Sequence, residues 1–174
     1  MKSFALLFLG ILACAQDLSG ADILIEPLPP VGSEISVSNE GVVDVKMDKA
    51  GTVILGRCKV EALPENYIII FTAEGMATEL NGGGIALVLY ALDGKDIAGR
   101  AYGGTNMISS SAKWSGLRTS YLAKATKQYD QIMLGVNCEV PCNIRLRNFK
   151  VEAMTRLEFE RRVDERRKKA TTPK

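Results

Sequence analysis

Cys138 and Cys142 are the two residues whose spacing most directly predicts covalent chemistry. Three residues separate them, one of which is Pro141. A hairpin of that length brings two α-carbons to about 5–6 Å, as a disulfide requires. The spacing is not the C-x-x-C of redox catalysts, and no helix follows it, so we expect a Cys138–Cys142 disulfide that shapes the hairpin. Cys58 is then the odd cysteine; we interpret it as a buried thiol, with pairing to Cys138 or Cys142 as the alternative.

Other spacings that resemble catalytic or ligand-binding motifs have simpler interpretations. Ser110 and Lys113 show the Ser-x-x-Lys spacing of some acyl-transfer enzymes, but that pair needs a helix, and this stretch is a serine-rich loop before an expected strand. Asp93 and Asp96 flank a turn and lack the further oxygen ligands of a calcium site. The Asn-Gly-Gly-Gly stretch at 81–84 lacks the lysine and helix of a phosphate loop, so we interpret it as a linker.

The composition argues further against an enzyme. The chain contains no histidine, which removes the commonest general base and the commonest zinc ligand. Nothing in the sequence places Glu74 and Glu79 at the separation of a glycosidase pair. We therefore predict no catalytic residue, no metal site and no cofactor.

Flat aromatic side chains matter if the domain binds sugars, because a sugar ring stacks its C–H surface on a π face. The chain has five tyrosines, five phenylalanines and one tryptophan. Arg100 and Asn106 lie near Tyr102 in the sequence and could donate hydrogen bonds to sugar hydroxyls. For Trp114 the alternative interpretation is packing under a loop at the edge of the core. The candidate carbohydrate-binding residues are Tyr90, Arg100, Tyr102, Asn106, Trp114 and Tyr121.

Two apolar runs, Tyr67–Phe71 and Ile85–Tyr90, are the elements around which these candidates are arranged. Both are short, rich in β-branched and aromatic residues and bounded by turn residues, so they predict strands. They are apolar at consecutive positions, which indicates cover on both faces and a central place in a sheet. Asp93-Gly94 after the second run predicts a tight hairpin turn, with a return strand over 96–102.

Further strands are predicted on both sides of this pair. Apolar and polar residues alternate from Val43 to Met47, as in a strand with one solvent-exposed face. In the stretch 143–153 the apolar positions change parity after Leu146, which predicts a β-bulge near Arg147-Asn148. The stretch 155–169 lacks glycine and proline and is dense in charge, so it predicts a helix. Its apolar residues Leu157, Phe159 and Val163 form a thin stripe, so we expect it to be only partly docked. Other strands are expected at 52–60, 113–122 and 128–136.

These segments predict an all-β fold: a two-sheet, antiparallel, jelly-roll-like β-sandwich with a charged C-terminal α-helix. In their order they resemble the jelly-roll modules of the galactose-binding-like, carbohydrate-binding group. The resemblance spans roughly 41–153 and departs at Arg147-Asn148, where an acidic residue is usual, so no metal or sugar role is carried over to that point. The segments that carry the resemblance are 67–71, Leu87–Ile97 with its Asp-Gly-Lys turn, the residue Trp114, and the stretches 129–135 and 148–151.

The N-terminus has one positive charge followed by an apolar stretch that is too short to span a bilayer, as in a secretory signal peptide. Small residues allow cleavage after Ala15 or after Ala21, and we favour the second. Ile11–Cys14 also resembles a bacterial lipobox, in which case Cys14 is acylated and the protein is anchored in the envelope. The expected organisation is a signal peptide over 1–21, an N-terminal arm with the first strands over 22–40, the sandwich over 41–153 and a charged helical tail over 154–174.

We therefore expect an exported, periplasmic or extracellular, non-catalytic module that binds a glycan or envelope polysaccharide. The alternative is a structural or assembly protein of the envelope that contacts other proteins. A formal net charge of +2 favours no polyanionic partner, and export argues against nucleic acid. A membrane contact is expected only if Cys14 is lipidated.

Overall fold

The computed structural model describes residues 23–24, 33–38, 40–59, 67–78, 80, 82–103, 108, 111–123 and 129–171. The expected signal peptide, Cys14, Glu79, Asn81, Asn106 and Ser110 lie outside these ranges. Within them the chain forms ten strands and one helix. The strands are β1 (Ile23–Leu24), β2 (Ser33–Val37), β3 (Val43–Met47), β4 (Gly51–Lys59), β5 (Tyr67–Thr78), β6 (Ile85–Asp93), β7 (Asp96–Tyr102), β8 (Ser111–Leu122), β9 (Gln131–Cys138) and β10 (Cys142–Thr155), and the helix is α1 (Arg156–Thr171).

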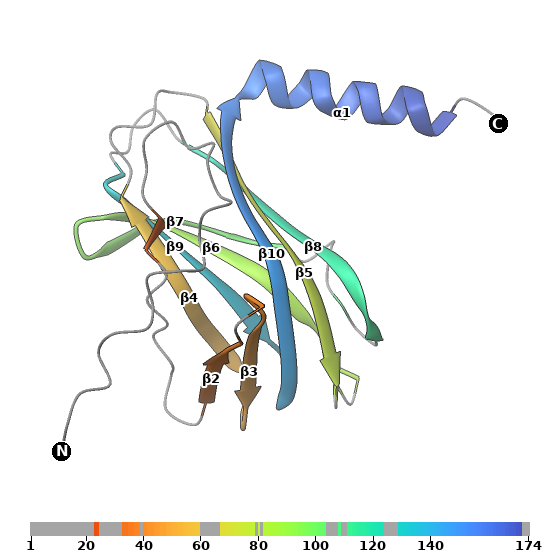
Figure 1. Cartoon of the computed structure of the whole chain (residues 1–174). Helices are drawn as coiled ribbons and strands as arrows, with labels where there is room; N and C mark the ends of the chain where they lie inside the picture. The colour runs from red at the N-terminus through yellow and green to blue at the C-terminus, as the bar shows by residue number, and fades with distance from the viewer. Residues whose placement is uncertain are drawn as a thin grey trace.

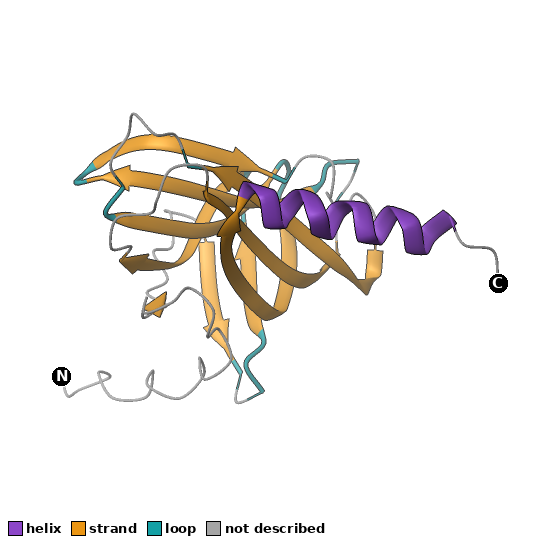
Figure 2. Ribbon diagram, turned by 90° about the horizontal axis from the view of Figure 1, so that it is seen from above, coloured by secondary structure: helices purple, strands orange, loops and turns teal. Residues whose placement is uncertain are grey.

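The strands form two five-stranded antiparallel sheets. Sheet A has the order β1-β4-β9-β6-β7 and sheet B the order β2-β3-β10-β5-β8. The sheets lie face to face (Figure 1), and one apolar cluster with members from both fills the space between them. Figure 2 shows the same two layers from above, with α1 crossing one of them. The predicted all-β sandwich with a C-terminal helix is confirmed.

Strands β6 and β5 are inner strands, each one position from the edge of its sheet, and both carry buried residues on consecutive positions. In β6 the odd-numbered residues from Ile85 to Ala91 enter the shared core, and β9 and β7 flank the strand. In β5, Ile69 and Phe71 face the core, whereas Ile68 and Ile70 form a second buried cluster on the outer face. The consecutive apolar positions therefore indicated buried inner strands correctly, but the central strands of the two sheets are β9 and β10.

Strand β5 is longer than its apolar run predicts, because it continues to Thr78. Its continuation turns Ala73, Gly75 and Ala77 toward the interior. A Cβ on Gly75 would lie within 3.3 Å of side-chain atoms of Leu117 and Leu146. The small residues that follow the predicted strand 67–71 are thus core positions, and large side chains from neighbouring strands pack against them.

The predicted bulge in β10 is present. Arg147 pairs with Glu74 and Lys150 with Thr72, so the register against β5 shifts between them. Asn148, at the bulge, has a φ of 54°, a conformation that asparagine tolerates better than most residues. The shift keeps Leu146 and Val151 both in the core although their spacing breaks the two-residue period.

Helix α1 begins directly at the end of β10. The Thr155 hydroxyl accepts a hydrogen bond of 3.2 Å from the Glu158 backbone N–H, as an N-cap does. Phe159 packs against Ile68, Ile70 and Met154 on the outer face of sheet B. Leu157, which we expected in the docking stripe, is instead 78% exposed, because it lies on the far side of the helix from Phe159.

The predicted Cys138–Cys142 disulfide is wrong for this structure. Both cysteines are buried and no disulfide joins them; Cys138 ends β9 in sheet A and Cys142 begins β10 in sheet B. The hairpin does bring them together, but as hydrogen-bonded thiols. That hydrogen bond and burial raise the pKa of the Cys138 thiol. Cys58 pairs with Ile23 in the backbone ladder, and its side chain lies outside the part that is described.

No helix within the described ranges has both the length and the apolar character that a membrane crossing needs.

Candidate functional site

Three of the six predicted carbohydrate-binding residues meet on the outer face of sheet A. Tyr90 in β6 lies directly opposite Arg100 in β7. The hydroxyls of Tyr90 and Tyr102 are 3.3 Å apart, and their rings are 6.3 Å apart and nearly perpendicular, at 83°. The Arg100 guanidinium carbon lies 5.9 Å from the centre of the Tyr102 ring. We call Tyr90, Arg100 and Tyr102 the tyrosine face.

The β6–β7 hairpin positions these side chains. Gly94 takes a φ of 60° at the turn, which is why Asp-Gly was a reliable sign of it. From that turn the pairing runs to Val88 opposite Tyr102. Because alternate residues of β6 enter the core, Tyr90 points outward.

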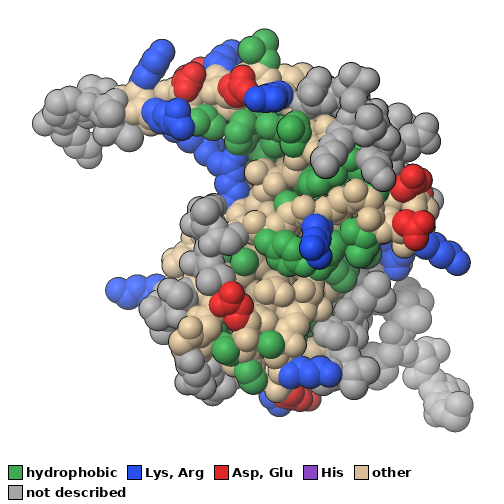
Figure 3. Space-filling view, turned by 180° about the vertical axis from the view of Figure 1, so that it is seen from behind, with side chains coloured by type: hydrophobic (Ala, Val, Ile, Leu, Met, Phe, Trp, Pro, Cys, Tyr) green, Lys and Arg blue, Asp and Glu red, His purple; other side chains and the backbone are tan. Residues whose placement is uncertain are grey.

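The tyrosine face is polar and accessible. Tyr102 is 47% exposed. Partial burial and the hydrogen bond with Tyr102 raise the pKa of Tyr90, while Thr52 and Arg100 act in the opposite direction. The Tyr90 hydroxyl therefore keeps its proton at neutral pH and can donate as well as accept. Figure 3 views the molecule from this side and shows hydrophobic side chains gathered over its middle with a basic side chain among them.

Neighbouring strands add further polar groups to this side of sheet A. The Thr52 hydroxyl of β4 donates a hydrogen bond of 3.0 Å to the Asn137 side-chain oxygen of β9. An aromatic surface edged by hydroxyl, amide and guanidinium groups can stack on the C–H face of a ring and hydrogen bond to hydroxyls around it.

Trp114 lies apart from the tyrosine face, on the outer side of sheet B in β8. The Arg147 guanidinium carbon is 4.0 Å from the centre of its ring and that of Arg145 is 5.9 Å away. Arg147 pairs with Glu74 and Arg145 with Asp44, each with an N–O distance of 2.8 Å. The Trp114 ring is half-buried, and one of its faces is occupied by arginine.

A groove of about 310 Å³ lies beside these ion pairs. The sequence interpretation did not identify it, although the signal was present: Asp44 and Lys46 alternate with core residues on β3, as Asn143 and Arg145 do on β10. Antiparallel pairing then places opposite charges side by side. The groove is lined by Glu34, Ile35, Ser36, Asp44, Val45, Lys46, Met76, Thr78, Asn143, Ile144 and Arg145.

Tyr121 does not belong to a surface site. It is only 8% exposed, and its hydroxyl lies 2.9 Å from that of Tyr129. The two rings meet edge to face at 5.8 Å. Burial and this hydrogen bond raise the pKa of Tyr121. Its prediction as a stacking platform is therefore corrected: the ring belongs to the core. Asn106 lies outside the described residues.

Within the ranges that the structure describes, no group of three or more His, Cys, Asp or Glu side chains is placed to hold a metal ion.

Comparison with known proteins gives similarity of fold alone. No family model matches the chain, and no curated protein matches it. Among solved structures, it is similar to a family 29 carbohydrate-binding module from Piromyces equi, at 14% identity and a TM-score of 0.44 over 77% of this chain and 89% of that one. It is also similar to the CBM22-1 xylan-binding domain of Paenibacillus barcinonensis Xyn10C, at 11% identity and a TM-score of 0.45 over 80% and 88% of the two chains.

An enzyme is also among the similar structures. The enzymatically active domain of bacteriophage CBA120 tailspike protein 4 matches at 7% identity and a TM-score of 0.47, over 78% of this chain and 20% of that one. The similar structures thus include carbohydrate-binding modules, the group that the sequence resembles. Because identities and TM-scores are this low, they say nothing of what this chain binds.

Proposed function

We propose that this protein is a non-catalytic module that binds a glycan through the tyrosine face. The observation that carries the proposal is the meeting of Tyr90, Arg100 and Tyr102 on one exposed surface, with the two hydroxyls 3.3 Å apart. Three residues selected from sequence for the same chemistry are brought together by the β6–β7 register. Trp114 lies on the other sheet, and Tyr121 is buried.

The chemistry of the tyrosine face suits a neutral sugar chain. Tyr102 has enough exposed ring for one sugar to stack on. The Tyr90 hydroxyl lies beside the Tyr102 hydroxyl and the Arg100 guanidinium lies over the Tyr102 ring, 5.9 Å from its centre, so both can hydrogen bond to the hydroxyls of a bound sugar. A shallow surface of this kind suits an extended polymer better than a small molecule, which needs an enclosing pocket.

Affinity electrophoresis through gels that contain soluble neutral polysaccharides, such as xylan, glucomannan and β-glucan, tests the proposal. We expect at least one polymer to retard the protein and Tyr102→Ala to abolish the retardation. Tyr102→Phe should keep part of it, because the ring remains while the hydroxyl is lost. Tyr67→Ala is the matched control, since it removes a partly exposed tyrosine from sheet B. Equal retardation of all four proteins, or of none, would count against the tyrosine face.

We further propose that the module is exported, with residues 1–21 as its signal peptide, 22–40 as an arm, 41–153 as the sandwich and 154–174 as the tail. The support is the N-terminal sequence pattern alone. The intact mass of the protein recovered from a bacterial host's envelope and medium tests it. A mass that begins after Ala21 supports export with cleavage there, and an acylated product that begins at Cys14 supports an envelope anchor. An uncleaved chain in the cytoplasm contradicts both.

A second candidate function is assembly with another protein of the envelope. It is favoured by the exposed apolar side chain of Ile97, 58% accessible on the same strand as Tyr102. Exposed apolar side chains mark protein contacts where they gather into a contiguous patch. Sedimentation over a range of concentrations separates the two: self-association that Ile97→Ser abolishes favours assembly, and a monomer at all concentrations favours the glycan module.

A further inference from the structure

Helix α1 and the outer face of sheet B enclose a small pocket that the glycan proposal does not use. The helix residues that face the sheet follow the spacing of one helical side, with Phe159, Arg162, Val163 and Arg166 three or four positions apart. Across from them lie Thr72 of β5 and Arg118 of β8. We call this space, of about 60 Å³, the helix–sheet pocket. Its volume accommodates a small anion or a few waters but no sugar ring.

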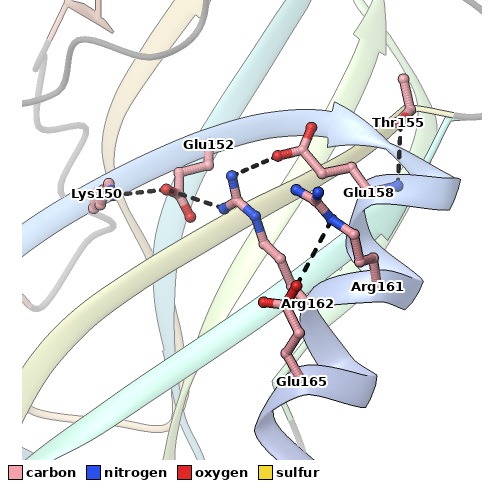
Figure 4. A network of polar contacts seen from close by, with 7 residues as sticks. All are labelled: Lys150, Glu152, Thr155, Glu158, Arg161, Arg162 and Glu165. Carbon is pink, nitrogen blue, oxygen red and sulfur yellow. Dashed lines mark hydrogen bonds and ion pairs between the residues drawn. The ribbon is translucent and has the colours of Figure 1, made fainter.

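Carboxylates in and around this pocket are already matched (Figure 4). Glu152 lies 2.6 Å from Lys150 and 3.7 Å from Arg162. Glu158 lies 2.6 Å from the same Arg162. The positive charges of Arg162 and Lys150 therefore neutralise the negative charges of Glu152 and Glu158.

Arg118 and Arg166 are left with unbalanced charge. Among the described residues, neither lies within ion-pair distance of a carboxylate. The Arg118 guanidinium carbon lies 5.4 Å from the centre of the Phe159 ring, which fixes it at the wall of the pocket. Burial, and then the charge of Arg166, lower the pKa of Arg118, against a smaller opposite effect of Glu152. Two positive groups thus face one confined space and repel each other.

We propose that the helix–sheet pocket binds one tetrahedral oxyanion, a sulfate or phosphate group, between Arg118 of the sheet and Arg166 of the helix. Guanidinium groups bind such oxygens with paired, charge-assisted hydrogen bonds. A tetrahedral group presents oxygens toward both walls, whereas the two oxygens of a carboxylate share one plane. The Thr72 hydroxyl also lines the pocket but donates its hydrogen to the Lys150 carbonyl oxygen, so the two guanidinium groups are the donors to the anion. The anion is free in solution or is an ester on a larger ligand.

This site is independent of the tyrosine face, which lies on sheet A at the other side of the sandwich. Tyr102→Ala should therefore leave anion binding unchanged. Loss of glycan binding and loss of anion binding can be observed separately, so the failure of one proposal does not decide the other.

The first experiment measures the thermal midpoint of the full chain in sodium phosphate, in sodium sulfate and in sodium chloride of equal ionic strength. Sulfate and phosphate stabilise many proteins without binding at a site, so variants must separate the two effects. We expect Arg118→Gln and Arg166→Gln to remove the part of the stabilisation that saturates with anion concentration. The affinity derived from that part should fall about tenfold or more for each variant, as expected when a charge-assisted hydrogen bond is lost.

Arg161→Gln is the matched control. Arg161 lies on the same helix and its side chain is 70% exposed, with only Glu165 near it at 4.0 Å. The Arg161→Gln variant loses the same charge as Arg166→Gln, but residue 161 does not line the pocket. The stabilisation of Arg161→Gln by phosphate and sulfate should therefore equal that of the parent. If Arg166→Gln and Arg161→Gln respond alike, or if chloride stabilises as well as phosphate does, the pocket is not an oxyanion site.

A second experiment identifies the source of the anion by competition with phosphate. Dextran sulfate is compared with dextran, and vesicles of phosphatidic acid in phosphatidylcholine are compared with phosphatidylcholine alone. Binding of dextran sulfate that Arg166→Gln abolishes supports a sulfate ester on a polymer, and vesicle binding with the same dependence supports a lipid headgroup. Phosphate binding with neither supports a free anion. Binding of either probe that Arg166→Gln leaves intact contradicts a role of this pocket.

Discussion

The Tyr121 hydroxyl of β8 occupies the position that a Cβ on Gly99 of β7 would need. The two residues belong to different sheets, so this contact sets how closely the sheets approach at that end of the sandwich. Tyr121 also shares a hydrogen bond with Tyr129, which fixes its ring. Glycine is therefore required at residue 99 because of a side chain that comes from the other layer.

Gly99→Ala should lower the free energy of unfolding by about 1–3 kcal/mol, the usual cost of forcing an extra methyl group into a packed interior. Chemical denaturation measures this. Gly116→Ala in β8 is the control, because a Cβ there would meet nothing within 4 Å. Adding Tyr121→Phe to Gly99→Ala should recover part of the loss, and strict additivity of the two changes would argue against the contact.

Asn148→Val should destabilise the protein by about 1–2 kcal/mol, because a β-branched residue is strained at a left-handed φ. The φ of Asn148 is 54°. Asn143→Val, on the same strand but without a positive φ, is the matched control and should cost less. Asn148→Gly should be tolerated better than Asn148→Val in the same denaturation series. A smaller effect of Asn148→Val than of Asn143→Val would mean that the bulge does not hold this conformation.

Glu74 should contribute to stability at neutral pH and not in acid. Its hydrogen bonds with Arg147 and then with Asn148 hold the pKa of Glu74 below its ordinary value of 4.5. A carboxyl whose pKa is lowered by folding stabilises the protein above the unfolded-state pKa, and that contribution disappears as the pH falls through the folded-state pKa.

The measurement is the difference in free energy of unfolding between the parent and Glu74→Gln as a function of pH. The difference should be constant at neutral pH, shrink below 4.5 and vanish once Glu74 is protonated in both states. Arg147→Gln should flatten the same pH dependence, because it removes the first cause of the shift. A difference that stays constant into acid would contradict the pairing.

Phe159→Ala should lower the free energy of unfolding by about 1–2 kcal/mol, since the half-buried ring covers apolar surface of sheet B. The surface consists of Ile68, Ile70 and Met154. Leu157→Ala, two residues away and 78% exposed, should change stability by no more than about 0.5 kcal/mol. Thermal and denaturant unfolding of both variants measure the contrast, and equal losses would mean that α1 docks differently.

Cys138 and Cys142 should resist alkylation in the native protein and react after unfolding without reductant. Both thiols are buried, and the pKa of Cys138 is raised, so little reactive thiolate is present at neutral pH. Peptide mass analysis before and after denaturation measures this. A peptide in which the two residues are covalently joined would contradict the free-thiol state.

Local signals in the sequence predicted several elements well. Asp93-Gly94 marked the hairpin and the change of parity after Leu146 marked the bulge, because both depend on backbone geometry within a few residues. The extension of β5 through Gly75 was missed, because what makes a small residue a core residue is the large side chain opposite it. That side chain, Leu117, lies far along the chain.

The candidate site was predictable only in part, for a similar reason. Tyr90, Arg100 and Tyr102 share a hairpin, so their proximity follows from the strand register. Tyr121 looked equivalent by composition, but its partner Tyr129 makes it a core residue. Trp114 meets Arg147 only because β10 and β8 flank the same strand, and no spacing along the chain reveals such an encounter.

Helix α1 leaves β10 with no residue between them, since Thr155 ends the strand and Arg156 begins the helix. The first turn of the helix is capped by Thr155, and the helix then turns away from the direction of the strand and runs across sheet B (Figure 1). The helix–sheet pocket lies between α1 and the outer face of sheet B. An anion at the proposed site would link Arg166 of the helix to Arg118 of β8, so we expect its binding to slow the local detachment of α1 from the sheet.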